Sequence, residues 1–144
     1  MLFGTMALSR TDKLEQIVIY TLNVDGWKLE WTGDKNLPYD AKGKTPKGKD
    51  CVVEMKFRNK YYEEKMLEKD KHDSLMALGN DVIKFYFVND PKGNFMYWLD
   101  NVELPDSISM YCPDATRWAK KRLNKDVYLL QENQATIINV NDLN

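Results

Sequence analysis

The chain has 144 residues, of which 43% are hydrophobic and 12% aromatic, and its formal net charge at pH 7 is −1. This length and composition predict a single domain over residues 1–144 and exclude a largely disordered chain. The near-neutral total conceals segregated charge, because segments 35–60 and 117–126 are basic whereas segment 81–114 between them is acidic.

Cysteine, histidine and hydropathy exclude several further classes. Cys51 and Cys112 are too few for a disulfide framework and lack the spacing of metal ligands. The single histidine, His72, lies in a charged stretch where a surface position is expected, which excludes histidine-based triads and His-rich metal sites. The segment "MLFGTMALSR" lacks the apolar core of a secretory signal, and no apolar run reaches the length of a membrane span. A cytoplasmic protein with no membrane partner is therefore expected.

Residues 12–23 form the first predicted helix. Their apolar side chains recur with helical spacing on one stripe, made of Leu14, Ile17, Val18, Thr21 and Leu22. Asp12 and Glu15 resemble a capping box, and the helical rotation places Glu15 at the edge of the stripe. Residues 27–31 then alternate as in a strand, with an apolar face of Trp27, Leu29 and Trp31.

A β-hairpin is predicted over residues 37–58. Residues 45–48, "TPKG", have the signature of a type I turn followed by a glycine in the left-handed position. If Thr45 pairs with Lys49, the register outward places Asp40 opposite Glu54. Directly opposed carboxylates share a face of the sheet and repel each other, so a cation, either Lys56 or a metal ion, is expected between them.

The second strand of this hairpin, "CVVEMKFR" (51–58), has an unusual polar face. Its apolar face consists of Cys51, Val53, Met55 and Phe57, and its other face of Val52, Glu54, Lys56 and Arg58. An acid, an amine and a guanidinium in a row on a half-covered strand are expected to meet water, a partner or a substrate.

The remaining elements complete an α/β pattern. Residues 61–78 are predicted to form a helix that stops at Gly79 and carries Lys71 within its apolar stripe. Residues 81–88 read as a buried central strand, and the turn over 89–94 leads into another strand at 95–99. A basic helix at 116–123 and a strand at 127–130 follow.

Asp40 and Glu54, with a lysine two residues beyond Glu54, suit the hydrolysis of a phosphodiester. Mg²⁺ prefers oxygen ligands and takes one or two carboxylates besides water and phosphate oxygens. The metal acidifies a bound water and neutralises charge in the transition state. Lys56 lies on the face of Glu54, where a lysine can orient the attacking water or stabilise developing charge.

These residues resemble the motif of the PD-(D/E)xK nuclease superfamily. The resemblance consists of Asp40 after "LPY", the hairpin turn, and Glu54-Met55-Lys56 within an apolar strand. It covers residues 10–100 and implies a mixed central sheet flanked by helices, the restriction-endonuclease-like αβββαβ core, with residues 101–144 as a helix and strand extension. The chain departs from the family pattern by having Pro-Tyr-Asp in place of Pro-Asp.

The resemblance also implies roles and partners. Asp40 and Glu54 would bind Mg²⁺ or Mn²⁺, Glu15 would be a further metal ligand, Lys56 would be the catalytic lysine, and Lys71 would support the site. The implied activity is a metal-dependent endonuclease acting on DNA, structure-specific like a junction resolvase or of a phage type, and many relatives form homodimers to cut both strands. Side chains expected to contact nucleic acid are Arg58, Lys60, Lys42, Lys44, Trp118 and Lys121.

Other interpretations of the same residues stay open. Glu54 and Lys56 would also suit a solvated sheet face with cross-strand ion pairs, Glu15 a helix cap, and Lys71 a side chain that extends from the stripe to water. The chain would then be a catalytically inert nuclease-fold module that binds nucleic acid or a protein partner. A structural or inhibitory protein with an interface on its sheet is the third hypothesis.

Overall fold

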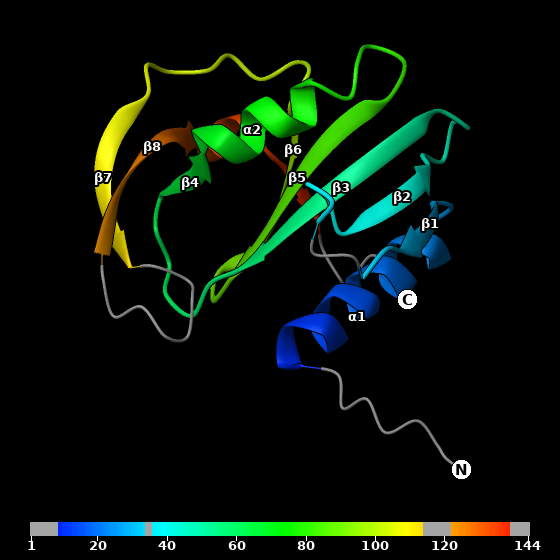
Figure 1. Ribbon diagram of the computed structural model, residues 1–144. Helices are drawn as coiled ribbons and strands as arrows, with labels where there is room; N and C mark the ends of the chain where they lie inside the picture. Colours follow the sequence, from blue (N-terminus) through cyan, green and yellow to red (C-terminus); the bar gives the residue numbers. More distant parts are fainter. Residues whose placement is uncertain (1–8, 34–35, 114–121, 139–144) are drawn as a thin grey trace.

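The computed structural model of the protein describes residues 9–33, 36–113 and 122–138, which form two sheets and two α-helices (Figure 1). The helices are α1 (Arg10–Val24) and α2 (Lys69–Met76), and a short 3-10 helix is η1 (Glu132–Gln134). The strands are β1 (Lys28–Trp31), β2 (Ala41–Lys44), β3 (Asp50–Phe57), β4 (Glu64–Glu68), β5 (Ile83–Asp90), β6 (Gly93–Trp98), β7 (Ile108–Pro113), β8 (Arg122–Gln131) and β9 (Thr136–Ile138).

The larger sheet is mixed and has six strands in the order β1-β2-β3-β5-β6-β9. Strands β3 and β5 run parallel, and the other neighbouring pairs of this sheet run antiparallel. The chain passes from β3 to β5 through β4 and α2, and β4 belongs to a second, antiparallel sheet of order β4-β8-β7. The prediction of an α/β fold with a mixed central sheet flanked by helices is confirmed.

Both faces of the larger sheet are covered, α1 lying on one side and α2 with the smaller sheet on the other (Figure 1). On the first side, Ile19 and Leu22 of α1 pack with Val53 of β3. On the second side, Leu75 of α2 and residues of β4 and β8 pack with Val52. The expected half-covered strand is therefore wrong for most of β3: Val52 is 2% exposed and Glu54 9%, and this face opens to water only at the two ends of the strand, at Asp50 and Lys56.

The β2–β3 hairpin has the predicted register. Ala41 faces Val53 and Lys44 faces Asp50, and the turn is closed by a hydrogen bond from the Thr45 amide to the Lys49 carbonyl oxygen (2.8 Å). Gly48 has φ +80°, the left-handed conformation that the sequence predicts. Such a turn fixes which residues of the two strands face one another, and hence where Asp40 meets Glu54.

Helix α1 is rotated and capped differently from the prediction. Its N-cap is Ser9, which forms a reciprocal capping box with Asp12, so the predicted box of Asp12 with Glu15 is wrong. Glu15 points into the protein with Ile19 and Leu22, whereas Ile17, expected in the stripe, is 59% exposed. The reason is that Trp31 donates its indole N–H to Glu15 Oε1 (3.0 Å), which satisfies a carboxylate on the buried face.

The predicted helix over 61–78 is wrong in its first half. Residues 64–68 form β4, which pairs with β8, and helix α2 begins only at Lys69. The alternation of buried and accessible residues in β4 depends on Lys65, whose side chain is 2% exposed and ion-paired to Asp90 at 2.8 Å. In a sequence, a lysine is expected to be exposed, so the buried position of Lys65 hides the alternation of buried and accessible residues that marks a strand.

The C-terminal region contributes more strand than the sequence indicated. The predicted strand at 127–130 is part of the longer β8, which also takes in Arg122 and Leu123 from the expected basic helix at 116–123. Residues 116–121 of that helix, including Trp118 and Lys121, lie outside the described residues. Strand β9 pairs with β6 and completes the larger sheet, although this segment gave no strand signal.

His72 is buried, contrary to the expected surface position. It is 7% exposed, its ring packs edge-on against Tyr128 with centroids 5.3 Å apart, and neither ring nitrogen has a hydrogen-bond partner among the described residues. The helix face that carries His72 is the one turned toward β8, because β4 holds α2 there. Neither α1 nor α2 is long and apolar enough to cross a membrane.

The buried Lys65–Asp90 pair yields a stability prediction. The Asp90→Asn variant should lower the free energy of unfolding by about 3 kcal/mol, because it leaves the buried Lys65 ammonium with only one, more distant carboxylate, that of Glu132 (3.4 Å). Urea unfolding followed by tryptophan fluorescence measures it. The matched control is Asp50→Asn, since the Lys44–Asp50 pair is equally short (2.7 Å) but exposed and should give no measurable change. Equal effects of the two substitutions would contradict the prediction.

Candidate active site

Two carboxylates, Asp40 and Glu54, lie together where β2 begins. The Asp40 amide donates to the Val53 carbonyl oxygen (2.9 Å), which extends the β2–β3 ladder by one residue. Beyond that point the Asp40 side chain takes over, since Oδ2 accepts a hydrogen bond from the Met55 amide (2.8 Å). The carboxylate of Asp40 is thereby fixed to the backbone of β3 directly beside Glu54, as the register predicted.

Burial and the neighbouring acid perturb Glu54. Burial, the negative charge of Asp40 and a hydrogen bond between the two groups together raise the pKa of its carboxyl group from 4.5 to about 8. Lys71 opposes this shift through its charge and its hydrogen bond. Near neutral pH, Glu54 therefore keeps a proton beside Asp40, the behaviour of two acids that share one site.

Of the expected cations, Lys56 or a metal ion, Lys56 forms no ion pair with Glu54 among the described residues, and the lysine that contacts Glu54 is Lys71. Lys71 extends from α2 and places Nζ 3.1 Å from Glu54 Oε2. Its position within the apolar stripe of the helix is explained by this contact, because the stripe faces the sheet that carries Glu54. Lys56 is exposed as a whole residue, but neighbouring protein atoms partly desolvate its ammonium group. This desolvation is the main cause that lowers its pKa, and the positive charge of Arg58 is the second.

A cavity of about 370 Å³ opens beside Asp40. It is lined by Asp40 of the hairpin, Lys71 of α2, Glu15 and Asp12 of α1, and the segment near Leu37. Glu15 thus shares a cavity with Asp40, as expected of a residue near the site. Among the described residues, however, no three acidic, histidine or cysteine side chains lie close enough together to hold a metal ion.

The donor set nevertheless fits a magnesium or manganese ion. Mg²⁺ requires one or two carboxylates and completes its shell with water and substrate phosphate oxygens. Asp40 and Glu54 supply two such carboxylates, and a divalent cation between them would remove the repulsion that raises the pKa of Glu54. The structure thus contains the minimal protein ligands for such an ion.

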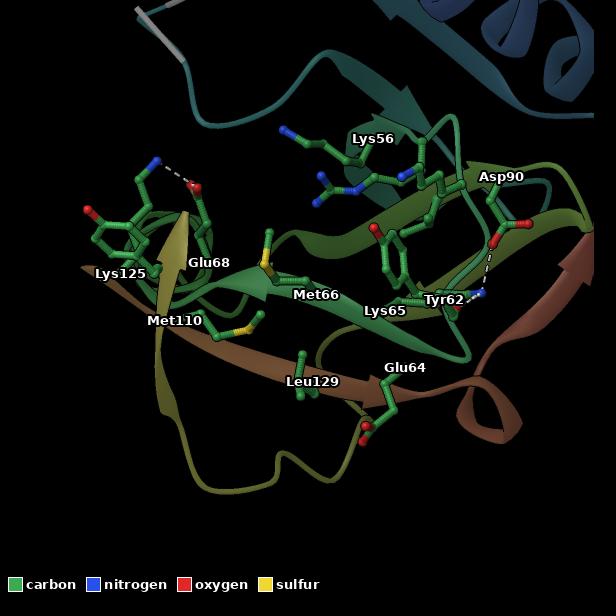
Figure 2. Close-up of a pocket in the computed structure, with 14 residues that line it drawn as sticks. Lys56, Tyr62, Glu64, Lys65, Met66, Glu68, Asp90, Met110, Lys125 and Leu129 are labelled. Carbon is green, nitrogen blue, oxygen red and sulfur yellow. Dashed lines mark hydrogen bonds and ion pairs between the residues drawn. The ribbon is translucent and has the colours of Figure 1, made fainter. Parts of the chain in front are cut away.

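The other predicted nucleic-acid contacts lie at different distances from the pair. Lys42 faces Val52 across the hairpin and is exposed, and Lys44, nearer the turn, is ion-paired to Asp50. Arg58 and Lys60 follow Lys56 and line a second pocket, away from Asp40 (Figure 2). Trp118 and Lys121 lie outside the described residues.

Residues that the sequence did not single out complete this second pocket. They come from β4 and the segment before it, from β7 and from β8, and include Tyr62, Met66, Met110, Tyr111 and Leu129. No usable signal in the sequence points to them, because the buried Lys65 hides the alternation that would mark 64–68 as a strand. That strand brings the smaller sheet next to the end of β3.

Comparison with known proteins assigns the architecture. No protein-family model matches the chain, and no curated protein matches it by sequence. Among solved structures it is similar to Hjc, a Holliday junction resolvase from the archaeal hyperthermophile Archaeoglobus fulgidus, over 90% of this chain and 93% of that chain, with a TM-score of 0.61 and 12% identity. The chain has the restriction-endonuclease-like fold.

The restriction-endonuclease-like fold confirms the architecture that the resemblance to PD-(D/E)xK nucleases implied. Helix α1, strands β1 to β3, helix α2 and strand β5 follow the expected αβββαβ order, and β4 is an insertion before α2. At 12% identity the similarity concerns the course of the backbone.

The raised pKa of Glu54 predicts a pH-dependent stability. Since folding lifts this pKa from 4.5 to about 8, the folded chain holds a proton that the unfolded chain releases. The resulting cost is absent below pH 4.5, grows as the pH rises above it, and is complete above about pH 8. In EDTA, Glu54→Gln should therefore be more stable than the wild type by about 4 kcal/mol at pH 7.5 and by much less at pH 5.

The matched control is Glu68→Gln. Burial raises the pKa of Glu68, but the hydrogen bond and charge of Lys125 lower it more, so its net shift is downward. This carboxylate stabilises the fold above its ordinary pKa and loses that effect as the pH falls, so Glu68→Gln should destabilise the protein at pH 7.5. Thermal melts of both variants from pH 5 to 8 provide the test, and a destabilising Glu54→Gln would contradict the proton assignment.

Proposed function

We propose that the chain acts as a single nuclease-like domain, a metal-dependent endonuclease of the PD-(D/E)xK type that hydrolyses DNA phosphodiester bonds. The observation that carries the proposal is the anchored Asp40 carboxylate beside Glu54, with Lys71 and Lys56 on the same side of the sheet. Acids and lysines in this arrangement within a restriction-endonuclease-like fold suit phosphodiester hydrolysis.

Asp40 and Glu54 would hold Mg²⁺ or Mn²⁺, which when bound supplies an acidified water and neutralises charge on the phosphate. Asp40 is suited to this because the Met55 amide fixes one of its oxygens. Glu54 must release its proton to become a ligand, and Lys71 favours that ionised form. Glu15 would add negative charge from the other side of the cavity that Asp40 lines.

The two lysines have separable roles in this proposal. Lys71 contacts Glu54 directly and would orient it and hold it ionised, so Lys71 is a positioning residue. Lys56, two residues along the same face of β3, would be the catalytic lysine that orients the attacking water or stabilises charge on the phosphate. The lowered pKa of Lys56 makes its neutral amine form easier to populate, and a general base must be in that form.

A branched or otherwise structured DNA is the proposed substrate. Support comes from the architecture shared with Hjc, which is itself a Holliday junction resolvase. The exposed Lys42 and the cations Arg58 and Lys60 would bind phosphates near the carboxylate pair, with Lys44 extending that surface. Trp118 and Lys121, which lie outside the described residues, stay proposed contacts from the sequence. A homodimer would allow two strands of one junction to be cut.

One observation favours a second candidate function. Lys71 lies where it neutralises Glu54 from within the protein, which is the charge balance of a nuclease-fold module that binds without a metal. Such a catalytically inert module would bind nucleic acid or a protein through its basic residues. Its binding would depend steeply on salt and would not respond to Mg²⁺.

Cleavage of labelled DNA tests the proposal directly. A four-way junction, a flap, a linear duplex and a single strand are incubated with the full chain in Mg²⁺, Mn²⁺ or EDTA. The wild type should cut a branched substrate only with metal, and Asp40→Asn, Glu54→Gln and Lys56→Ala should each lower the rate by about 100-fold or more, because each removes a ligand or proton-transfer group. Gel analysis of the products gives the rates.

Glu30→Gln and Lys28→Ala are the matched controls, since both residues are exposed on β1 at the edge of the sheet, and both variants should cut like the wild type. Metal-independent DNA binding with no cleavage of any substrate would reject the enzyme and leave the inert module.

A further inference from the structure

A second pocket lies next to the candidate active site, between the end of β3 and the smaller sheet (Figure 2). Its volume is about 330 Å³, within the range of sites for small ligands. Lys56 lines it and stands two residues from Glu54 on the same face of β3. A strand of nucleic acid held at Glu54 would therefore pass directly over the opening of this pocket.

The interior of the pocket is apolar and adaptable. Met66 of β4, Met110 of β7 and Leu129 of β8 gather on one side of it, and in Figure 2 Lys56 enters from the other. Methionine side chains are flexible and polarizable, and they make favourable contacts with aromatic rings. Such a floor suits a flat aromatic group of variable shape.

Two exposed tyrosines stand at the rim. Tyr62 is 58% exposed and Tyr111 64% exposed, and both line the pocket. The backbone that carries Tyr62 is fixed, because the buried Lys65 Nζ donates to the Tyr62 carbonyl oxygen (2.6 Å) while also pairing with Asp90. An aromatic ring on a fixed backbone is a stacking platform for nucleobases.

The charges around the pocket favour an anionic strand. Its acidic residues are already satisfied: Glu68 pairs with Lys125 (2.9 Å), Asp90 with Lys65, and Glu64 accepts a hydrogen bond from Gln131 (2.8 Å). Three further lining cations, Lys56, Arg58 and Lys60, form no ion pair with a carboxylate in the part of the chain that the structure describes. Lys56 lies on the polar face of β3, and Arg58 and Lys60 follow it in the segment after the strand, so the three cations form a basic track that leads away from Glu54.

We infer that this pocket binds an unpaired nucleobase of the DNA strand whose phosphates follow Lys56, Arg58 and Lys60. The base stacks on Tyr62 or Tyr111 and its edge contacts the methionine floor. This inference rests on the proposed nuclease function and deepens it, because it makes the substrate a DNA with a displaced or unpaired base next to the scissile phosphate. A continuous duplex, whose bases are stacked internally, offers no group for the pocket.

Fluorescence of 2-aminopurine tests the inference with the full chain in EDTA, where no cleavage occurs. One probe carries 2-aminopurine at the unpaired position of a flap, and a second carries it within a complete duplex. Binding should quench the flap probe and leave the duplex probe unchanged. Tyr62→Ala should abolish the quenching and weaken flap binding about tenfold, whereas Tyr62→Phe, which keeps the ring, should behave like the wild type.

The matched control is Tyr20→Ala, since Tyr20 is 73% exposed on α1, away from this pocket, and its loss should change nothing. Tyr111→Ala tests the other ring and serves if Tyr62→Ala fails to fold by circular dichroism. Unchanged quenching in both alanine variants would overturn the inference. Equal quenching of free 2-aminopurine deoxynucleotide would also overturn it, because the pocket would then serve a free nucleotide.

Cleavage in Mg²⁺, measured in parallel, separates this inference from the proposed function. A wild type that cuts DNA while the tyrosine variants quench normally would reject the pocket alone. Tyrosine-dependent quenching by a wild type that cuts nothing would support the pocket and reject the nuclease.

Discussion

The hydrogen bond from the Met55 amide to the Asp40 carboxylate is the contact on which the candidate site depends. It forms where the backbone hydrogen bonds between β2 and β3 end, so the side chain of Asp40 adds one more hydrogen bond to β3 beyond the last backbone one. An acid held in this way cannot move away from Glu54, whatever the repulsion between them. The hairpin turn, the register and the pKa of Glu54 near 8 are linked through this one bond.

Two lysines fix the segment between β3 and β5 against the larger sheet. Lys65, paired with Asp90, stabilises the junction between β4 and the larger sheet, and Lys71 reaches from α2 to Glu54. Both lysines lie on the segment between β3 and β5, so the same stretch of chain supplies a strand of the second sheet and the lysine that contacts Glu54. The ammonium of Lys65 would be costly to bury without Asp90, which ties the position of this segment to an acid of the larger sheet.

The sequence predicted those parts of the site that depend on local rules. Turn chemistry at 45–48 and the period of two in β3 were sufficient to place Asp40 opposite Glu54, and both are properties of neighbouring residues. It failed where long-range pairing overrides local preference. Because Lys65 was expected to be exposed, residues 64–68 were predicted to be helical, whereas they form β4. His72 was expected at the surface, but the ring of Tyr128, which is distant in sequence, packs against it. The contact between Lys71 and Glu54 could not be derived from the sequence for the same reason, since only the packing of α2 brings the two side chains together.

The central claim is that Asp40 and Glu54 form a metal site, and calorimetric titration of Mn²⁺ into the full chain without DNA tests it most directly. Because Glu54 holds a proton near pH 7, binding should release it, and the measured enthalpy should vary with the ionisation enthalpy of the buffer. The account predicts such binding in the wild type and its loss in Asp40→Asn and Glu54→Gln. Binding that persists in both variants, or no binding by the wild type, would contradict it.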